Sequence, residues 1–316
     1  MGYPLFMLFG INGAALALIH GGASKLWLGG LLMAAIAVSF LAERAIPYEP
    51  DWNRPHEDVG RDLVHFVVNE TSNILSILAL PLLSSLVTVR DAWPHEWPFV
   101  LQVLLAVLVF DFGVTLTHWL SHRVPALWRI HAVHHSVKRF YGFNGLMKHP
   151  LHQALEMTVG VAPLLLIGLP SSIALALAAL SCVQLLMQHS NANYTVGPLK
   201  HLLALNAGHR FHHLKWAGVG DVNFGLFTNL WDYLLGTWSY TPEKRFSSVE
   251  LGIAKEPDFP KGYWAQLLKP FKAARMSDDD PPGVSTIRCG THGRSSESQE
   301  EIARRQGRKS PAVDSP

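Results

Sequence analysis

The residues best suited to chemistry in this chain are its histidines. The sequence holds 17 of them, and twelve fall between His118 and His213. They include a His-x-x-x-His pair, then a His-x-x-His-His group, then a single histidine, then a second His-x-x-His-His group. The members in chain order are His118, His122, His131, His134, His135, His189, His209, His212 and His213. Neutral imidazole is the commonest protein ligand for zinc, copper and iron, so these groups indicate a metal site.

The spacing of the histidines predicts how they meet. Residues three and four apart share one face of a helix, so His118 and His122 can converge on one ion. By the same argument, each His-x-x-His-His group can bring its three rings to one ion. Nine ligands exceed the four that a tetrahedral zinc takes, and they fit two ions with open positions. The expected non-ligands are His20, His56, His95, His201 and His292.

The composition indicates a membrane protein around this site. The 316 residues are 49% hydrophobic and only 16% charged, against about 25% charged in soluble domains. Mean hydropathy is +0.17. A net charge of +2 implies neither nucleic acid nor an acidic partner. Four apolar stretches, each compared with the ~20 residues that span a bilayer, predict about four transmembrane helices. They are residues 5–19, 26–46, 63–89 and 99–117.

A fifth apolar region, residues 157–187, is broken in the middle by Gly168-Leu169-Pro170. Histidine groups lie on both sides of it, so the region must leave and return at one face if they share a site. We expect a helical hairpin, which could be re-entrant. The fold prediction is therefore all-α: a polytopic membrane protein with a histidine-rich cap that holds a di-metal site.

Basic residues predict the orientation. The connection after the second apolar stretch holds three basic residues and the segment after the fourth holds five, whereas Lys25 and Arg90 stand alone in the other two connections. The three are Arg44, Arg54 and Arg61, and the five are Arg123, Arg129, Lys138, Arg139 and Lys148. This bias predicts a cytoplasmic N-terminus and a cytoplasmic cap. The N-terminal apolar run lacks a basic region before it, so we interpret it as a retained helix rather than a signal peptide.

Four segments follow from these patterns. Residues 1–46 should form N-terminal transmembrane helices, 47–245 a catalytic domain and 246–275 a C-terminal extension. Residues 276–316 are rich in Ser, Gly, Pro and mixed charge, which predicts a disordered tail. Two cysteines, Cys182 and Cys289, support neither a disulfide framework nor a four-cysteine metal site. We expect no organic cofactor.

With these motifs, the sequence resembles the fatty acid hydroxylase/sterol desaturase superfamily of membrane di-iron enzymes, over roughly residues 43–240. The resemblance rests on the histidine groups, on Asp111 ahead of them, on Asn191 after His189, and on Asn223-Phe-Gly225 and Trp231-Asp232. It implies two iron ions, replaceable by zinc in purified samples. It also implies O₂-dependent hydroxylation or desaturation of a lipid C–H bond. Electrons would come from a separate ferredoxin or cytochrome b5-like donor.

The sequence also departs from that superfamily. Some members carry a tenth ligand histidine four residues after the third group, where this chain has Asn193. Others carry a His-Pro-x-Glu motif, which reads His149-Pro150-Leu151-His152 here. His152 is therefore either a tenth ligand or a support for the ligands. His149 is a weaker candidate, and Asn193 is expected to support a ligand.

Several polar residues accompany the apolar stretches. Asp111 shares a helix face with His118 but lies about 10 Å away along the axis, too far to bind the same ion readily. We expect it to accept a hydrogen bond from another ligand's ring N–H, and Asp232 to act similarly. A further polar row runs along the third stretch, where we favour interhelical hydrogen bonding over a polar wall beside the site. Its members are Asp62, His65, Asn69, Ser72 and Ser76.

The function that these features favour is a lipid oxygenase, with hydroxylation preferred over desaturation. The alternative is a membrane metal-binding or metal-transport protein, although transport sites usually lie near the bilayer midplane rather than at its edge. A catalytically silent scaffold is a third hypothesis, which the near-complete ligand set disfavours. The lipid itself stays open among acyl chains, sterols or hopanoids, and alkylglycerol ethers.

Overall fold

The computed structural model describes residues 2–87, 92–241 and 244–272, all within one compact unit. The ordered elements of these residues are helices, and three isolated β-bridges pair residues of the connecting segments. The predicted all-α fold is confirmed. The predicted tail, residues 276–316, lies outside the described residues, as do His292 and Cys289.

Five helical segments are long and apolar enough to cross a membrane, which makes the chain an integral, multi-pass membrane protein. The first apolar stretch is among them. It runs continuously through α1 (Gly2–Leu5), a π-helical segment η1 (Phe6–Ile11) and α2 (Asn12–His20). The other four spans lie in α3 (Lys25–Ala45), α4 (Val59–Val87), α5 (Phe99–Ser121) and α8 (Ser171–Gln188).

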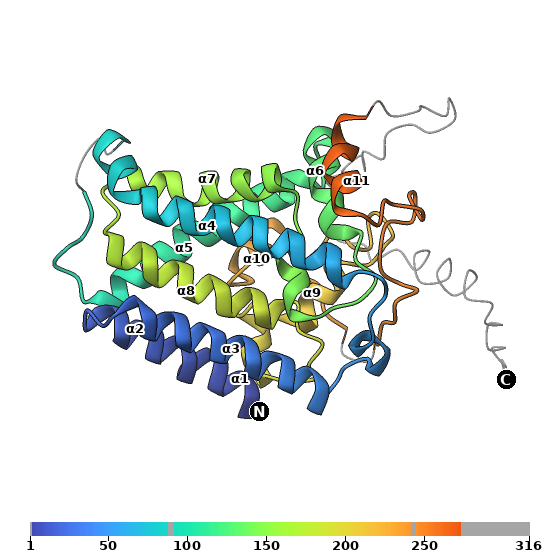
Figure 1. Cartoon of the computed structure of the whole chain (residues 1–316), viewed down its shortest axis with the longest axis horizontal. Helices are drawn as coiled ribbons and strands as arrows, with labels where there is room; N and C mark the ends of the chain where they lie inside the picture. Colours follow the sequence, from blue (N-terminus) through green and yellow to red (C-terminus); the bar gives the residue numbers. More distant parts are fainter. Residues whose placement is uncertain (1, 88–91, 242–243, 273–316) are drawn as a thin grey trace, which may run out of the picture. The chain divides into compact units, whose positions relative to one another are not determined.

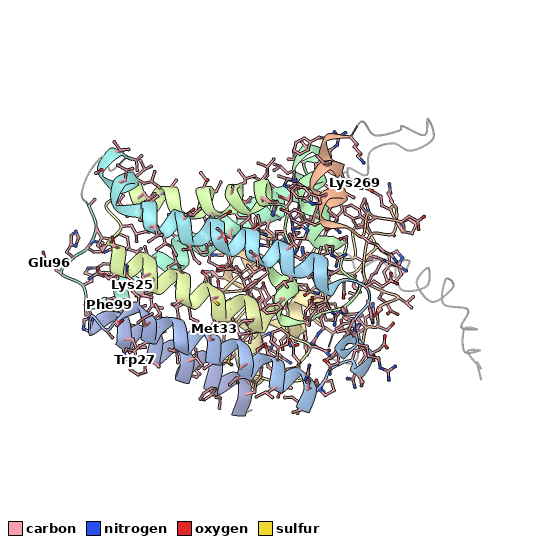
Figure 2. All side chains as sticks on the ribbon, viewed as in Figure 1. Lys25, Trp27, Met33, Glu96, Phe99 and Lys269 are labelled. Atoms are coloured by element: carbon pink, nitrogen blue, oxygen red, sulfur yellow. The ribbon has the colours of Figure 1, made fainter. Side chains whose placement is uncertain are left out.

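The outer faces of these helices are apolar, whereas the polar atoms gather at one end. Figure 2 shows nitrogen and oxygen atoms concentrated around the end that carries Lys269, while the labelled Trp27 and Met33 lie on α3, away from that end. Trp27 is 71% exposed and Met33 is 64% exposed. Large exposed apolar faces of this kind are typical of contact with lipid.

The predicted hairpin is present as α7 (Pro150–Leu166) and α8. Gly168 adopts a positive φ of 92° between them, and the N–H of Leu169 donates to the carbonyl of Leu164. Both the start of α7 and the end of α8 therefore lie at the histidine-rich end. Of the two hairpin helices, α8 is by itself long and apolar enough to span a bilayer.

The long helices pack side by side (Figure 1). α5 contacts α7 and α8, α4 contacts the same pair, and α2 and α3 lie along α8. Two glycines allow α5 and α7 to approach closely. A Cβ on Gly113 would lie 2.6 Å from the Cα of Gly160, so any side chain there would push the helices apart.

The remaining elements form a cap at one end of these helices (Figure 1). The N-terminus lies at this end, because the Tyr3 ring packs 5.4 Å from the ring of Tyr194 in the cap. At the other end, the ring of His20 contacts the ring of Phe99. The cap elements are η2 (Pro50–Asn53), α6 (Pro125–His135), η3 (Gly142–Leu146), η4 (Gly197–His201), α9 (Asn206–His212), α10 (Leu230–Leu235), α11 (Tyr263–Leu268) and η5 (Lys269–Phe271).

The polar row on α4 divides into two parts. Its buried members are Asp62, His65 and Asn69. Their side chains bond at 2.8 to 3.0 Å to the segment 141–148, which leads toward α7. Ser72 and Ser76 are exposed and donate to carbonyls of their own helix. The buried half of the row therefore fixes a cap segment rather than another span.

Candidate metal centre

The nine predicted histidines lie together in two groups. Within each group, the nitrogens that could bind a metal all lie within 4.8 Å of one another. The five-histidine group consists of His118, His122, His131, His135 and His212. The four-histidine group consists of His134, His189, His209 and His213. The ring of His135 stacks 4.6 Å from that of His213, so the groups adjoin.

The structure corrects the expectation that each His-x-x-His-His triplet serves one ion. His131 and His135 join the five-histidine group, whereas His134 between them joins the other. The α9 triplet is divided the same way, with its middle histidine in the five-histidine group. Residues four apart are offset by only about 40° around a helix, but neighbours are offset by about 100°. Each triplet therefore bridges both groups.

The rings within each group face one another through Nε2. Nε2 of His118 lies 2.8 Å from Nε2 of His212. In the four-histidine group, Nε2 of His209 lies 2.9 Å from Nε2 of His189. Such short distances between two ring nitrogens require either a shared proton or a cation between them.

The opposite ring nitrogen decides between these alternatives. Nδ1 of His118 donates to the carbonyl of Phe224 at 2.8 Å, and Nδ1 of His212 donates to the carbonyl of Val222 at 2.9 Å. A carbonyl oxygen only accepts, so each ring carries its proton on Nδ1 and has a lone pair on Nε2. Two lone pairs that face each other repel unless a cation lies between them. The residues present therefore fit a metal ion.

Burial keeps these rings in the form that binds metal. Removal from water, reinforced by neighbouring imidazoles, holds the pKa of His134, His135 and His213 well below its usual range. Burial likewise lowers the pKa of His189 to about 3. Neutral imidazole is the ligating form, so the site is ready to bind cations at neutral pH.

Two residues that sequence reasoning missed hold rings of the two histidine groups in place. Nδ1 of His122 donates to Oδ1 of Asp221 at 2.8 Å. Burial raises the pKa of Asp221, but its hydrogen bond with His122 outweighs this effect and the pKa is lowered overall. Asn144 in η3 accepts from Nδ1 of His189 at 3.1 Å. No spacing pattern connects these partners to their histidines.

Asp111 and Asp232 act differently from our expectation. Asp111 accepts the backbone N–H groups of three consecutive residues, 226–228, at 2.7 to 3.1 Å. Asp232 accepts the N–H of Phe224 at 2.7 Å and that of Gly225 at 2.8 Å. The hydrogen-bond partners of these two carboxylates include no ring of the two histidine groups. Both hold the loop 224–228, whose Phe224 carbonyl orients His118.

His152 lies beside the five-histidine group without joining it. Its ring centroid is 4.4 Å from that of His131, and its Nε2 lies 3.0 Å from Oγ of Ser121. Nδ1 of His152 lies 3.7 Å from Oε1 of Glu156. These contacts place His152 beside the five-histidine group.

The other sequence candidates lie outside both groups. His149 caps α7 by accepting the N–H of Leu151, and its Nε2 bonds to the carbonyl of Leu267. The side chain of Asn193 is exposed, so the expectation that it supports a ligand is not met. The described histidines that we expected to be non-ligands also lie outside both groups: His20, His56, His95 and His201.

A small cavity borders the two groups. Three of its lining histidines, His134, His189 and His209, belong to the four-histidine group, whereas His118 alone comes from the other. The apolar lining consists of Val114, Leu185, Phe224 and Leu226, and the polar lining includes Lys148, Glu156 and Gln188. The cavity therefore places apolar side chains and a few polar groups side by side at the two histidine groups.

Comparison with known proteins agrees with this geometry. Residues 103–237 match the model of the fatty acid hydroxylase family. The ornithine lipid hydroxylase OlsE of Rhizobium tropici is 31% identical over 278 residues, which cover 85% of this chain and 82% of the relative. No solved structure matches the chain.

Two other relatives match about half of the chain. Alkylglycerol monooxygenase of Danio rerio is 27% identical over 48% of this chain and 33% of its own length. Sphinganine C4-monooxygenase 2 of Arabidopsis thaliana is 27% identical over 49% of this chain and 62% of its own length. The chain is a member of the fatty acid hydroxylase family, a membrane-bound oxidoreductase that hydroxylates lipids.

Proposed function

We propose that this chain uses two iron ions to hydroxylate a C–H bond of a polar membrane lipid, and that residues 47–245 carry the catalytic machinery. The observation that supports this most is the pair of adjoining histidine groups, whose Nε2 lone pairs converge beside a cavity at the end of the spans. Iron is preferred over zinc because zinc has no redox chemistry. Zinc can nevertheless occupy such imidazole sites in purified protein.

The reaction has a simple balance. A C–H bond of the lipid breaks and a C–O bond forms, one oxygen atom of O₂ enters the lipid, and the other leaves as water with two electrons and two protons. Bound iron would supply the activation of O₂. The residues of the chain orient the lipid in the cavity, hold the ligand rings and exclude water.

For the substrate, we propose a lipid of the ornithine lipid class. The relative that bears this name is aligned along most of both chains, whereas the other two relatives match about half of this chain. The cavity also combines apolar walls with a buried ion pair, Lys148 and Glu156, which suits a lipid with a polar group near the reacting carbon.

The electrons would come from a separate ferredoxin or cytochrome b5-like protein. We propose that this donor docks at α6, where the partly exposed Trp128 packs 5.2 Å from the ring of His122 and 5.3 Å from that of His135. The exposed Arg129 beside it would attract an acidic donor surface. Electrons would then reach the five-histidine group first.

We further propose that the cap lies on the cytoplasmic side, as the distribution of basic residues predicts. Single cysteines can test this in a background that lacks Cys182 and Cys289. Ala126 in the cap and Ser171 at the hairpin turn are both exposed. A cysteine at Ala126 should label only from the cytoplasm, and one at Ser171 should not. Labelling of Ala126→Cys from the outside would reverse the orientation.

The alternative of metal transport has less support. Transport sites usually lie near the bilayer midplane on broken helices, whereas these histidines come largely from cap elements at one end of the spans. A transporter would bind and release metal without an oxidised lipid product, so a product assay separates the two functions.

The direct test uses the purified full chain, loaded with ferrous iron under anaerobic conditions, in vesicles that contain ornithine lipid. Adding NADPH as reductant, a [2Fe–2S] ferredoxin, its reductase and ¹⁸O₂ should give lipid with one labelled oxygen atom. His213→Ala should give none, because it lacks a ligand. Stable iron binding in the wild type without label in any lipid of the vesicle would contradict the proposal.

A further inference from the structure

One feature of the cavity is not needed to bind metal. Lys148 and Glu156 form an ion pair, with Nζ 2.6 Å from Oε2. Lys148 is 9% exposed and Glu156 is 3% exposed. Both line the same cavity as His118 and His134. A buried ion pair therefore stands beside the site that would hold two cations.

The pair is held firmly from both sides. The backbone carbonyl of Lys148 accepts hydrogen bonds from Nδ1 of His65 and from the amide of Asn69, at 3.0 Å each. Glu156 lies on α7, which the close glycine contact fixes against α5. The position of the Lys148 ammonium is thus set by α4, α5 and α7 together.

Stability alone does not explain this pair. Desolvating two charges costs about as much as their attraction returns, and apolar residues of similar volume usually stabilise a protein as well or better. A second buried pair, Arg139 and Asp58, shows the contrast. Its guanidinium donates two hydrogen bonds to Asp58 and one to the carbonyl of Trp52, so all three of its nitrogens have an acceptor.

The Lys148 ammonium makes fewer hydrogen bonds than the Arg139 guanidinium. It has three N–H donors. Within residues 2–87, 92–241 and 244–272, Glu156 is its only hydrogen-bond partner. Since Lys148 lines the cavity, its remaining donors are available to whatever enters there. A buried donor favours an acceptor oxygen, because an apolar occupant would leave it unsatisfied.

We propose that Lys148, oriented by Glu156, binds an acceptor oxygen of the lipid, namely the carbonyl of an amide or ester linkage. This rests on the proposed function and specifies which C–H bond reacts. The cavity is small, and Lys148 lines it together with His134, His189 and His209. The hydroxylated carbon therefore lies within a few bonds of that linkage, not in the middle of a hydrocarbon chain.

The test compares variants that remove or keep the donor. The double variant Lys148→Met/Glu156→Leu removes both charges, so no single charge stays buried. Lys148→Arg keeps a cationic donor. Gln153→Met is the matched control, because Gln153 is a buried polar residue on the same helix that bonds to Asn73 and does not line the cavity. Iron content, KM, kcat and the position of the hydroxyl group, located by fragment mass spectrometry, are measured for each.

The double variant should keep both irons, raise KM for ornithine lipid by about tenfold or more, and spread the hydroxyl over several carbons. Lys148→Arg should restore a single position, and Gln153→Met should match the wild type. A double variant with an unchanged KM and a single unchanged position would overturn the inference, as would loss of iron, which would mean a structural role. If the wild type hydroxylates no lipid, it is the proposed function that fails.

Discussion

The two histidine groups differ in ligand number and in surroundings. The five-histidine group includes the half-buried His122, which is bonded to Asp221 and packed against Trp128. The four-histidine group is buried throughout and supplies three of the four histidines that line the cavity. One group thus faces the protein surface through a charged partner, and the other faces the space where a lipid would lie.

This difference suggests a division of labour. An ion with four ligands keeps more open positions than one with five, and open positions are where O₂ must bind. We infer that an ion in the four-histidine group would bind O₂, next to the lipid. The five-histidine group, closer to Trp128 and Arg129, would receive electrons from the donor.

The largest effect is expected from removing a ligand. His213→Ala takes away one of only four ligands, so iron content should fall from two ions per chain to about one. Hydroxylation should drop by more than about 100-fold, beyond the usual effect of changing a ligand's outer partner. His201→Ala is the control, since His201 is exposed and bonds to Tyr233. Equal losses in both variants would undo the assignment of ligands.

A smaller effect is expected from changing an outer partner. Asp221→Asn keeps the shape but removes the charge that orients His122, so activity or iron affinity should fall by roughly 10- to 100-fold. The weakened iron should be the one in the five-histidine group. Asn144→Leu should instead weaken the four-histidine group through His189. If both variants released the same iron, as judged by its spectrum, the two groups would not be independent sites.

Charge reversal at the donor surface should be milder still. Arg129→Glu should reduce ferredoxin-driven turnover by about tenfold at low salt, with less effect at high salt. A single turnover driven by dithionite should be unchanged, because the metal site is untouched. Arg54→Glu, at another exposed position, serves as the matched control. Equal losses with both reductants would mean that Arg129 supports the structure of the metal site rather than the binding of the donor.

The smallest effects are expected on the lipid-facing part of α4. Ser72→Ala and Ser76→Ala each remove an exposed hydroxyl, so unfolding free energy should change by no more than about 0.5 kcal/mol. Asn69→Ala leaves the carbonyls of Leu146 and Lys148 without its amide donor, at a cost of about 1–3 kcal/mol. Thermal unfolding in detergent measures both. A cost at Ser72 as large as that at Asn69 would contradict the division of the polar row.

Much of this arrangement was predictable because it depends on local sequence patterns: the length of apolar stretches, a turn signal and the spacing of histidines. Apolar length predicted the spans, the Gly168-Leu169-Pro170 break predicted the hairpin, and histidine type and spacing predicted nine residues that the fold brings together. Helical spacing alone could not show that His134 and His212 cross to the opposite group, because this depends on where the second group lies.

Sequence reasoning missed some functional residues because their partners are distant in the chain or because spacing says nothing of a cavity. His122 and Asp221 are 99 positions apart, and only tertiary packing joins them. The case of Asp111 is similar: its helix face was predicted, but its partners are backbone groups of a loop more than a hundred positions away. Lys148 and Glu156 are close in sequence, yet nothing in their spacing indicates that they border a cavity.

The central claim is that the two histidine groups hold two distinct iron ions. The most direct measurement is Mössbauer spectroscopy of the full chain, reconstituted anaerobically with ⁵⁷Fe(II), together with iron analysis of the same sample. Two ferrous signals of equal area are expected, with His134→Ala weakening one and His131→Ala weakening the other. A fully active protein with one iron per chain, or two signals that both variants diminish equally, would contradict the account.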